Sequence, residues 1–373
     1  MAVSASRIPG LDGLRGIAAS IVLMTHASNN GYHLLPGVSL SGTGRSGVLL
    51  FFVLSAFLLT SQVLAWDPKD LLRWPRWQRY LEARVLRIWP LFLVVLLACL
   101  ITSHLNHLPV LWRLSPLFDR LPLPMTFASF LAHIRLEAGE DILWTIPVEF
   151  KFYLVLPLLL LPLLIPQRPA APVIRIVLLG LIVAFFYLIP TTLDGVSTFP
   201  FIGVFLVGVM LAFLTFRDGP RAASARRAYE VVAWACVAIW ILCIPSVFLA
   251  VTGNEFPIAE IENHPFLAPL WGLLIVCMLR GTGQMRRLLD SKVLVWAGAV
   301  SYSLYLWHRV PIKLVSRLET LGYADRLPVF LRSWLIVATA FLLAYGSYAL
   351  VERPVQRWRG RRDRAARPAR LGT

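Results

Sequence analysis

One apolar segment near the start of the sequence carries an arginine and a histidine whose spacing places them on one helical face. Arg15 and His26 are eleven residues apart. At about 100° per residue they project within about 20° of each other, roughly 16 Å apart along the axis. Ionisable groups inside a membrane span cost free energy and often mark a functional site. A hydrogen bond from His26 to a neighbouring helix is the structural alternative.

Two arginines further along the chain share a second helical face. Arg84 and Arg87 are three residues apart at the start of an apolar run, so their guanidinium groups point the same way and together suit a polyphosphate. Ordinary anchoring by positive residues at the cytoplasmic end of a span explains the same pattern. The pair therefore indicates a candidate anion site.

Two more ionisable residues interrupt apolar runs. Glu149 follows Pro147 by two residues, and a proline inside a span frees backbone groups that can line a cavity. His308 ends the aromatic run that starts at Ser301, and a place in the aromatic belt at a membrane interface explains it better than a role in chemistry. None of these spacings by itself names a reaction.

The composition indicates what must hold these residues in place. Of the 373 residues, 58% are hydrophobic and 15% are charged, a balance too apolar for a soluble chain of this length. Apolar runs of about 20 residues, the length that crosses a bilayer, predict an all-α, polytopic membrane protein with ten spans. Their ranges are 12–31, 47–66, 86–105, 143–165, 173–190, 199–216, 231–251, 265–280, 293–312 and 329–351.

Basic residues indicate which side of the membrane each connection faces, because short cytoplasmic connections collect lysine and arginine. They follow the second, fourth, sixth and eighth spans and fill the tail at 359–373, so both termini are expected in the cytoplasm, with residues 1–358 forming one domain in the plasma membrane. The tail itself is expected to be disordered. The net charge of +16 lies in these clusters and not along a polar stripe, so no nucleic-acid partner is expected. The basic residues that follow these four spans are Lys69, Arg73, Arg76, Arg79, Arg84, Arg168, Arg175, Arg217, Arg221, Arg226, Arg227, Arg280, Arg286, Arg287 and Lys292.

Six sequence blocks occur in a fixed order between about residue 7 and residue 358. They are Leu11-Asp12-Gly13-Leu14-Arg15-Gly16 followed by His26, Gly47 to Ser55, Arg84-x-x-Arg87-Ile88-x-Pro90, Leu143-Trp144 with Glu149 and Phe152-Tyr153, Ser301 to His308, and Glu352-Arg353-Pro354. In this order and spacing the blocks resemble the acyltransferase-3 family of membrane O-acyltransferases.

The resemblance implies a ten-helix membrane domain that takes an acyl group, commonly acetyl, from cytoplasmic acyl-CoA. The acceptor is a hydroxyl of a glycan, a glycolipid or a small glycosylated metabolite. Arg15 and His26 match the family's basic residue and histidine separated by ten residues. The family's paired arginines correspond to Arg84 and Arg87, and its glutamate before Phe-Tyr corresponds to Glu149. The resemblance thus implies acyl-CoA binding by the three arginines and catalysis by His26 and Glu149, with no metal.

Two chemical routes stay open for His26. Imidazole, with a reference pKa near 6.5, can take the proton of the acceptor hydroxyl as it attacks, or can itself accept the acyl group. Glu149 can orient the histidine or hold the sugar. A transporter or flippase of a lipid-linked glycan and a non-catalytic membrane sensor are the alternatives, but the sequence shows no inverted repeat with paired broken helices.

Overall fold

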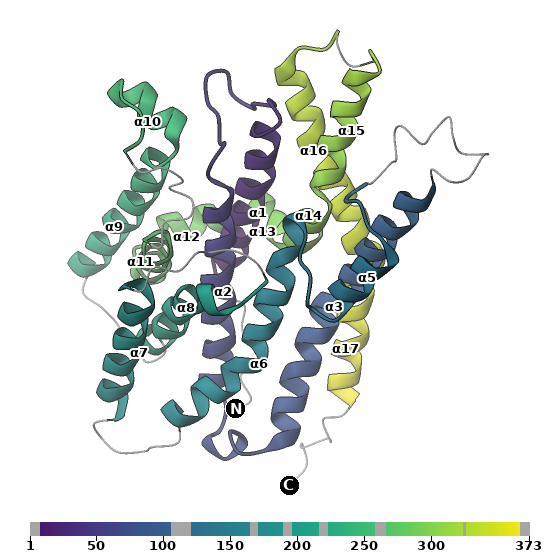
Figure 1. Cartoon of the computed structure of the whole chain (residues 1–373). Coiled ribbons are helices and arrows are strands. Elements are labelled where there is room, and N and C mark those ends of the chain that lie inside the picture. The colour runs from purple at the N-terminus through teal and green to yellow at the C-terminus, as the bar shows by residue number, and fades with distance from the viewer. Residues whose placement is uncertain are drawn as a thin grey trace.

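The computed structural model is all-α in the part of the chain that it describes (Figure 1). The described residues are 8–105, 121–164, 171–188, 196–215, 223–257, 266–323 and 326–365. The α-helices are α1 (Leu11–Ser28), α2 (Gly44–Leu64), α3 (Trp74–Leu105), α5 (Phe127–Ile134), α6 (Thr145–Leu164), α7 (Ala171–Leu188), α8 (Ile202–Thr215), α9 (Ala223–Leu242), α10 (Pro245–Thr252), α11 (Leu267–Arg280), α12 (Gln284–Leu289), α13 (Lys292–Ala299), α14 (Ser301–Trp307), α15 (Arg309–Thr320), α16 (Val329–Ser347) and α17 (Arg353–Ala365). Short helical turns are η1 (Pro68–Asp70), η3 (Asp141–Trp144), η4 (Phe199–Phe201) and the π-helical η6 (Tyr348–Glu352).

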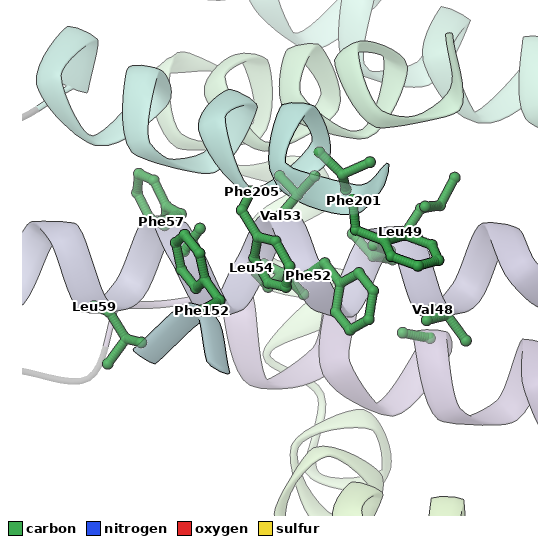
Figure 2. Close-up of a cluster of buried hydrophobic side chains, with 14 of the residues drawn as sticks. Val48, Leu49, Phe52, Val53, Leu54, Phe57, Leu59, Phe152, Phe201 and Phe205 are labelled. Atoms are coloured by element: carbon green, nitrogen blue, oxygen red, sulfur yellow. The ribbon is translucent and has the colours of Figure 1, made fainter. Parts of the chain in front are cut away.

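The helix α2 packs most extensively against α8, and aromatic side chains fill the space between them (Figure 2). Phe52 of α2 stacks on Phe205 of α8 with ring centroids 4.6 Å apart, and Phe152 of α6 stacks on Phe205 at 4.0 Å. Gly208 permits the close approach, because a Cβ there would lie 2.3 Å from the carbonyl oxygen of Val53. This core fixes α2 and α6, which both contribute to the site described below.

Contact between backbones positions α1 against α13. A Cβ at Gly298 would lie 2.0 Å from the carbonyl oxygen of Asp12, and a Cβ at Gly16 would lie 2.8 Å from the nitrogen of Gly298. Small residues at such a crossing let two helices approach closely. Because α13 leads through α14 into α15, the contact sets the end of α1 beside the junction of α14 and α15.

The long helix α3 runs beside the C-terminal part of the chain. The elements α16, η6 and α17 follow one another without a break, and both η6 and α17 contact α3. π-helical turns such as η6 occur frequently at functional sites. The predicted start of a disordered tail, at residue 359, falls inside α17, which is helical to Ala365; residues 366–373 lie outside the described part.

Four helices are long and apolar enough to cross a membrane, by length and composition. They are Gly44–Leu64, Trp74–His104, Asp141–Leu161 and Val329–Arg364, and a fifth arises if Ser224–Leu242 and Pro245–Thr252, bent by 90°, form one span. These counts refer to the described ranges. Apolar helices of this kind give the chain the character of an all-α membrane protein, while the ten spans stay a prediction.

Two further expected spans, besides the bent range 231–251, differ from uninterrupted apolar helices. The range 293–312 is divided among α13, α14 and α15. The helix α1 is absent from the set of apolar helices, because it carries the ionisable residues Asp12, Arg15 and His26 within 18 residues. The residues that make α1 a candidate for function are therefore the ones that lower its hydropathy.

The two ends of the molecule are distinguished by the elements that lie there. The connection between α2 and α3 lies at the same end as the last turn of α17, which we call the basic end (Figure 1). The helix α10 and the facing ends of α15 and α16 lie at the opposite end, which we call the distal end. Lys69 and Arg73 belong to that first connection. Arg168, Arg217 and Arg221, on which the predicted topology also rests, lie outside the described residues.

Candidate active site

Four of the five predicted site residues line one cavity. Arg15 of α1, Arg84 and Arg87 of α3 and Glu149 of α6 surround a space of about 80 Å³, which we call the inner cavity. The structure thus brings together the three arginines expected to bind the donor. His26 does not line this cavity, so Glu149 and His26 are not brought together.

Two hydroxyl groups hold the Glu149 carboxylate. Ser55 Oγ donates a hydrogen bond to Glu149 Oε1 at 2.6 Å, and the Tyr153 hydroxyl donates to the same oxygen. The two hydroxyl oxygens are 3.1 Å apart. Hydrogen bonds to a carboxylate are strong and fix its orientation. Glu149 therefore contributes a fixed negative charge among the arginines of the inner cavity, and its geometry does not orient the ring of His26.

Two of the inner-cavity arginines have an unused donor. The Nε atoms of Arg15 and Arg84 are buried and have no hydrogen-bond partner within the described part of the chain. A buried donor without an acceptor costs about 1–3 kcal/mol, and guanidinium N–H groups match the oxygens of a phosphate. The inner cavity is therefore suited to an anionic ligand.

The third arginine is already paired. Arg87 Nη1 lies 3.0 Å from Glu352 Oε2, and Ser303 Oγ donates to Glu352 Oε1 at 2.6 Å. Glu352 is 4% exposed and belongs to the π-helical turn η6. The guanidinium also lies over the ring of Tyr302, 5.8 Å from its centroid. These contacts fix the direction of Arg87 at the junction of α3, α14 and η6.

A larger cavity of about 320 Å³ adjoins the inner cavity. Arg84 and Arg87 line both spaces, and the facing wall of the larger one comes from α17, including Gln356 and Arg359. We call this space the entrance cavity. A charged ligand can reach the inner cavity between α3 and α17.

His26 lines a separate cavity near the end of α1. This outer cavity measures about 160 Å³ and is also lined by Asn29, Asp141, Trp144 and Tyr305. Among the described residues, none lines both the inner and the outer cavity. The imidazole therefore faces a partly open cavity between helices.

The first residue of α15 determines the hydrogen bonding of His26. Arg309 Nη1 lies 3.3 Å from His26 Nδ1, and Arg309 Nε lies 2.8 Å from Asp141 Oδ2. A guanidinium group only donates hydrogen bonds, so Nδ1 of His26 accepts, and the proton of the neutral ring lies on Nε2. Asp141 and Arg309 thus form an ion pair that orients the imidazole from one side.

A second histidine lies against His26. The prediction of a place in an interfacial aromatic belt for His308 is wrong: the residue is 0% exposed, and its ring centroid is 5.0 Å from that of His26. Its Nδ1 donates to the carbonyl oxygen of Tyr305 at 2.6 Å, whereas its buried Nε2 has no partner among the described residues. The junction of α14 and α15 turns this side chain toward α1, and the local sequence pattern carries no sign of that turn.

Two aromatic rings separate the inner and outer cavities. Phe51 lines the inner cavity and Tyr305 the outer one, and their rings meet edge to face with centroids 6.3 Å apart. The Tyr305 hydroxyl donates to the carbonyl oxygen of Ile142 at 2.7 Å and accepts from Thr145 at 3.1 Å. Phe51 and Tyr305 thus bring the linings of the two cavities into contact.

Only weak sequence signals mark three residues that the structure adds to the site. Arg309 follows His308 directly, Asp141 precedes the Leu143-Trp144 block, and Glu352 opens the Glu-Arg-Pro block. Each stands next to a recognised block, but only the fold shows what it contacts. No group of three or more His, Cys, Asp or Glu side chains in the described ranges is placed to hold a metal ion.

Comparison with known families identifies the class of protein. The sequence model of the family described as an acyltransferase domain matches residues 8–351. The chain therefore belongs to this acyltransferase family, which confirms the resemblance drawn from the six blocks. Fold, site and family together define a membrane-type, all-α acyltransferase domain.

Two curated relatives are similar in sequence to most of this chain. The peptidoglycan O-acetyltransferase OatA of Listeria monocytogenes is 28% identical over 368 residues, which cover 94% of this chain and 56% of that protein. The Bacillus subtilis protein YrhL, provisionally named a peptidoglycan O-acetyltransferase, is 26% identical over 369 residues. These residues cover 94% of this chain and 55% of that protein. The chain thus spans about half the length of these relatives. No solved structure gives a significant match.

Proposed function

We propose that the protein transfers an acyl group, acetyl in the first instance, from acyl-CoA to a hydroxyl group of a carbohydrate-containing acceptor. The acceptor class comprises glycans, glycolipids and small glycosylated metabolites, and the reaction takes place in the plasma membrane. One observation carries the proposal: a cavity rich in arginine and a cavity lined by a histidine lie on either side of a pair of aromatic rings.

The entrance and inner cavities fit the donor. Acetyl-CoA carries phosphate groups at one end and a thioester at the end of a long, thin arm. Arg84 lines both cavities, and its buried Nε has no partner in the described chain, so it is placed to bind phosphate oxygens. With the nucleotide at the basic end, the arm extends past Arg15 toward Phe51 and Tyr305.

The outer cavity fits the acceptor. Its polar side chains include Asn29, Asp141 and His26, and the indole of Trp144 lies beside them. A sugar presents hydroxyl groups to polar side chains and a C–H face to an aromatic ring, so this lining suits a carbohydrate better than an apolar ligand. The two relatives are named for a carbohydrate-containing acceptor, peptidoglycan.

His26 is the group placed to act on the reacting atoms. The acceptor hydroxyl attacks the thioester carbonyl, a C–O bond forms, the C–S bond breaks, and the hydroxyl proton passes by way of the imidazole to the departing thiolate. Arg309 occupies Nδ1 of the resting ring, so proton uptake there requires Arg309 to release the ring and stay with Asp141. Transient acylation of the imidazole is the second route, and trapping of an acylated His26 in the absence of acceptor distinguishes it.

Release of free CoA by the purified protein tests the proposal. Acetyl-CoA is incubated with a panel of muropeptides and simple glycosides, and both thiol release and the mass of the acceptor are measured. The wild type should release CoA and add one acetyl mass to an acceptor, whereas His26→Ala should do neither. His104→Ala is the matched control, because His104 is an exposed residue of α3 far along the chain from the site. Full turnover by the His26 variant would overturn the assignment, as would an absence of acetylated product from the wild type with every acceptor.

A further inference from the structure

The C-terminal helix α17 forms one wall of the entrance cavity. Gln356, Arg359, Gly360 and Asp363 of α17 face Arg84 and Arg87 of α3 across a space of about 320 Å³. Positions 356, 359, 360 and 363 recur at helical spacing, so they lie on one face of α17. The helix that continues from the Glu352-Arg353-Pro354 block thus brings a third guanidinium group to the cavity.

An ion pair holds this face of α17 against α3. Arg362 pairs with Glu82 of α3, and the elements η6 and α17 both contact α3. Arg359 therefore belongs to a helix that packs beside α3. Its neighbour Arg361 is exposed and does not line the cavity.

The charges around the cavity show what Arg359 adds. Arg87 is paired with the buried carboxylate of Glu352 at 3.0 Å, so its direction is set before any ligand arrives. Arg359 forms a weaker ion pair. Its Nε lies 3.6 Å from Asp363 Oδ2, and the two side chains are 33% and 46% exposed. Exposed ion pairs of this kind contribute little to stability. A phosphate group can therefore replace Asp363 as the partner of Arg359.

We propose that Arg359 binds the phosphate groups of the donor nucleotide together with Arg84, so that α17 is part of the donor site. The inference rests on the proposed function, because it takes acyl-CoA as the donor. A diphosphate between α3 and α17 meets Arg84 on one side and Arg359 on the other. The arm of the donor then points into the inner cavity, which Arg84 also lines.

Binding of CoA and its fragments to Arg359→Gln tests the inference. Calorimetric titrations in neutral detergent compare CoA, dephospho-CoA and pantetheine, which carries no phosphate. The Kd values for CoA and for dephospho-CoA, which keeps the diphosphate, should both rise about tenfold in the variant. The Kd for pantetheine should not change. Arg361→Gln removes the same charge from the same helix and should bind CoA like the wild type. In turnover, KM for acetyl-CoA should rise in Arg359→Gln while kcat is retained.

Several outcomes decide against the inference. An unchanged Kd for CoA in Arg359→Gln overturns it, as does an equal loss for pantetheine, which indicates a structural effect. Arg359→Lys keeps the charge and should recover part of the affinity, so a folding defect in the glutamine variant is distinguishable. If adding phosphatidylglycerol raises the wild-type Kd for CoA but Arg359→Gln binds CoA normally in neutral detergent, the cavity takes a lipid phosphate and the inference is overturned. Absence of CoA binding by the wild type overturns the proposed function as well.

Discussion

The inner and outer cavities use arginine in opposite ways. In the inner cavity, Arg15 and Arg84 each have a buried Nε without a partner among the described residues. Beside the outer cavity, Arg309 directs Nε to Asp141 at 2.8 Å and Nη1 to His26 at 3.3 Å. The first arrangement leaves guanidinium donors available to an anion, whereas in the second the guanidinium is paired with Asp141 and orients the ring proposed to act in catalysis.

The two cavities also differ in how the chain builds them. The inner cavity is formed by side chains of α1, α2, α3, α6 and α14. The outer cavity includes residues at helix ends: Asn29 follows α1 and Asp141 begins η3. Arg309, which contacts both His26 and Asp141, begins α15. Regular helices thus form most of the inner cavity, and helix ends converge from distant parts of the sequence around His26. Under the proposed function, substitutions should therefore change donor binding and chemistry separately.

The largest effect is expected from His26→Ala, which removes the imidazole from the outer cavity. General acid–base catalysis contributes about 10²–10⁴-fold to a rate, so kcat should fall by that factor. Stopped-flow or endpoint measurement of CoA release with an active acceptor checks it. A fall in kcat of less than about tenfold would mean that another group takes the hydroxyl proton.

Arg309→Gln should reduce kcat by about 10- to 100-fold, because hydrogen bonds to charged groups contribute about 1.5–3 kcal/mol. The variant leaves His26 in place and removes the charged donor that orients it, so KM for acetyl-CoA should stay near the wild-type value. Arg317→Gln, further along the same helix, is the control. If KM for the donor rises instead, Arg309 belongs to the donor site and the separation of the two cavities fails.

Arg84→Gln should raise KM for acetyl-CoA by about tenfold and leave kcat within about twofold, since it removes a donor to the phosphates and no group near His26. The exposed Arg79, at the basic end of α3, provides the control variant Arg79→Gln. Steady-state kinetics over a range of donor concentrations separate the two constants. A loss confined to kcat would contradict the assignment of the inner cavity to donor binding.

Glu352→Gln should have the smallest effect, a rise of about threefold to fivefold in KM for acetyl-CoA. The glutamine keeps the hydrogen bond with Ser303 but loses the charge that directs Arg87. In an Arg87→Gln background the same change should add nothing further, because the two residues act as one pair. Additive effects in this double-mutant cycle would show that Glu352 acts elsewhere.

The sequence was most informative where the chain is a regular helix. Helical spacing paired Arg84 with Arg87 and placed Arg15 and His26 on one segment, and the structure has both of the latter on α1. Spacing within a helix could not show that Arg15 and His26 line different cavities, because the separating rings come from α2 and α14.

The sequence was least informative where the chain breaks. His308 and Arg309 lie at the junction of α14 and α15, inside a range that hydropathy predicted as one span. An interruption of this kind changes the direction of every side chain after it, so periodicity no longer predicts what they contact. Glu149 shows a related limit of prediction from sequence. Its block was recognised, but the hydrogen bonds from Ser55 and Tyr153 hold its carboxylate in the inner cavity.

Direct measurement of acetyl-CoA binding to His26→Ala and Arg84→Gln, side by side with the wild type, tests the division between the two cavities. Titration calorimetry on the purified proteins requires no acceptor. We expect the His26 variant to bind acetyl-CoA within about twofold of the wild type and the Arg84 variant to bind it at least about tenfold more weakly. Equal loss of donor binding in both variants would contradict the account, because His26 would then be part of the site that the arginines form.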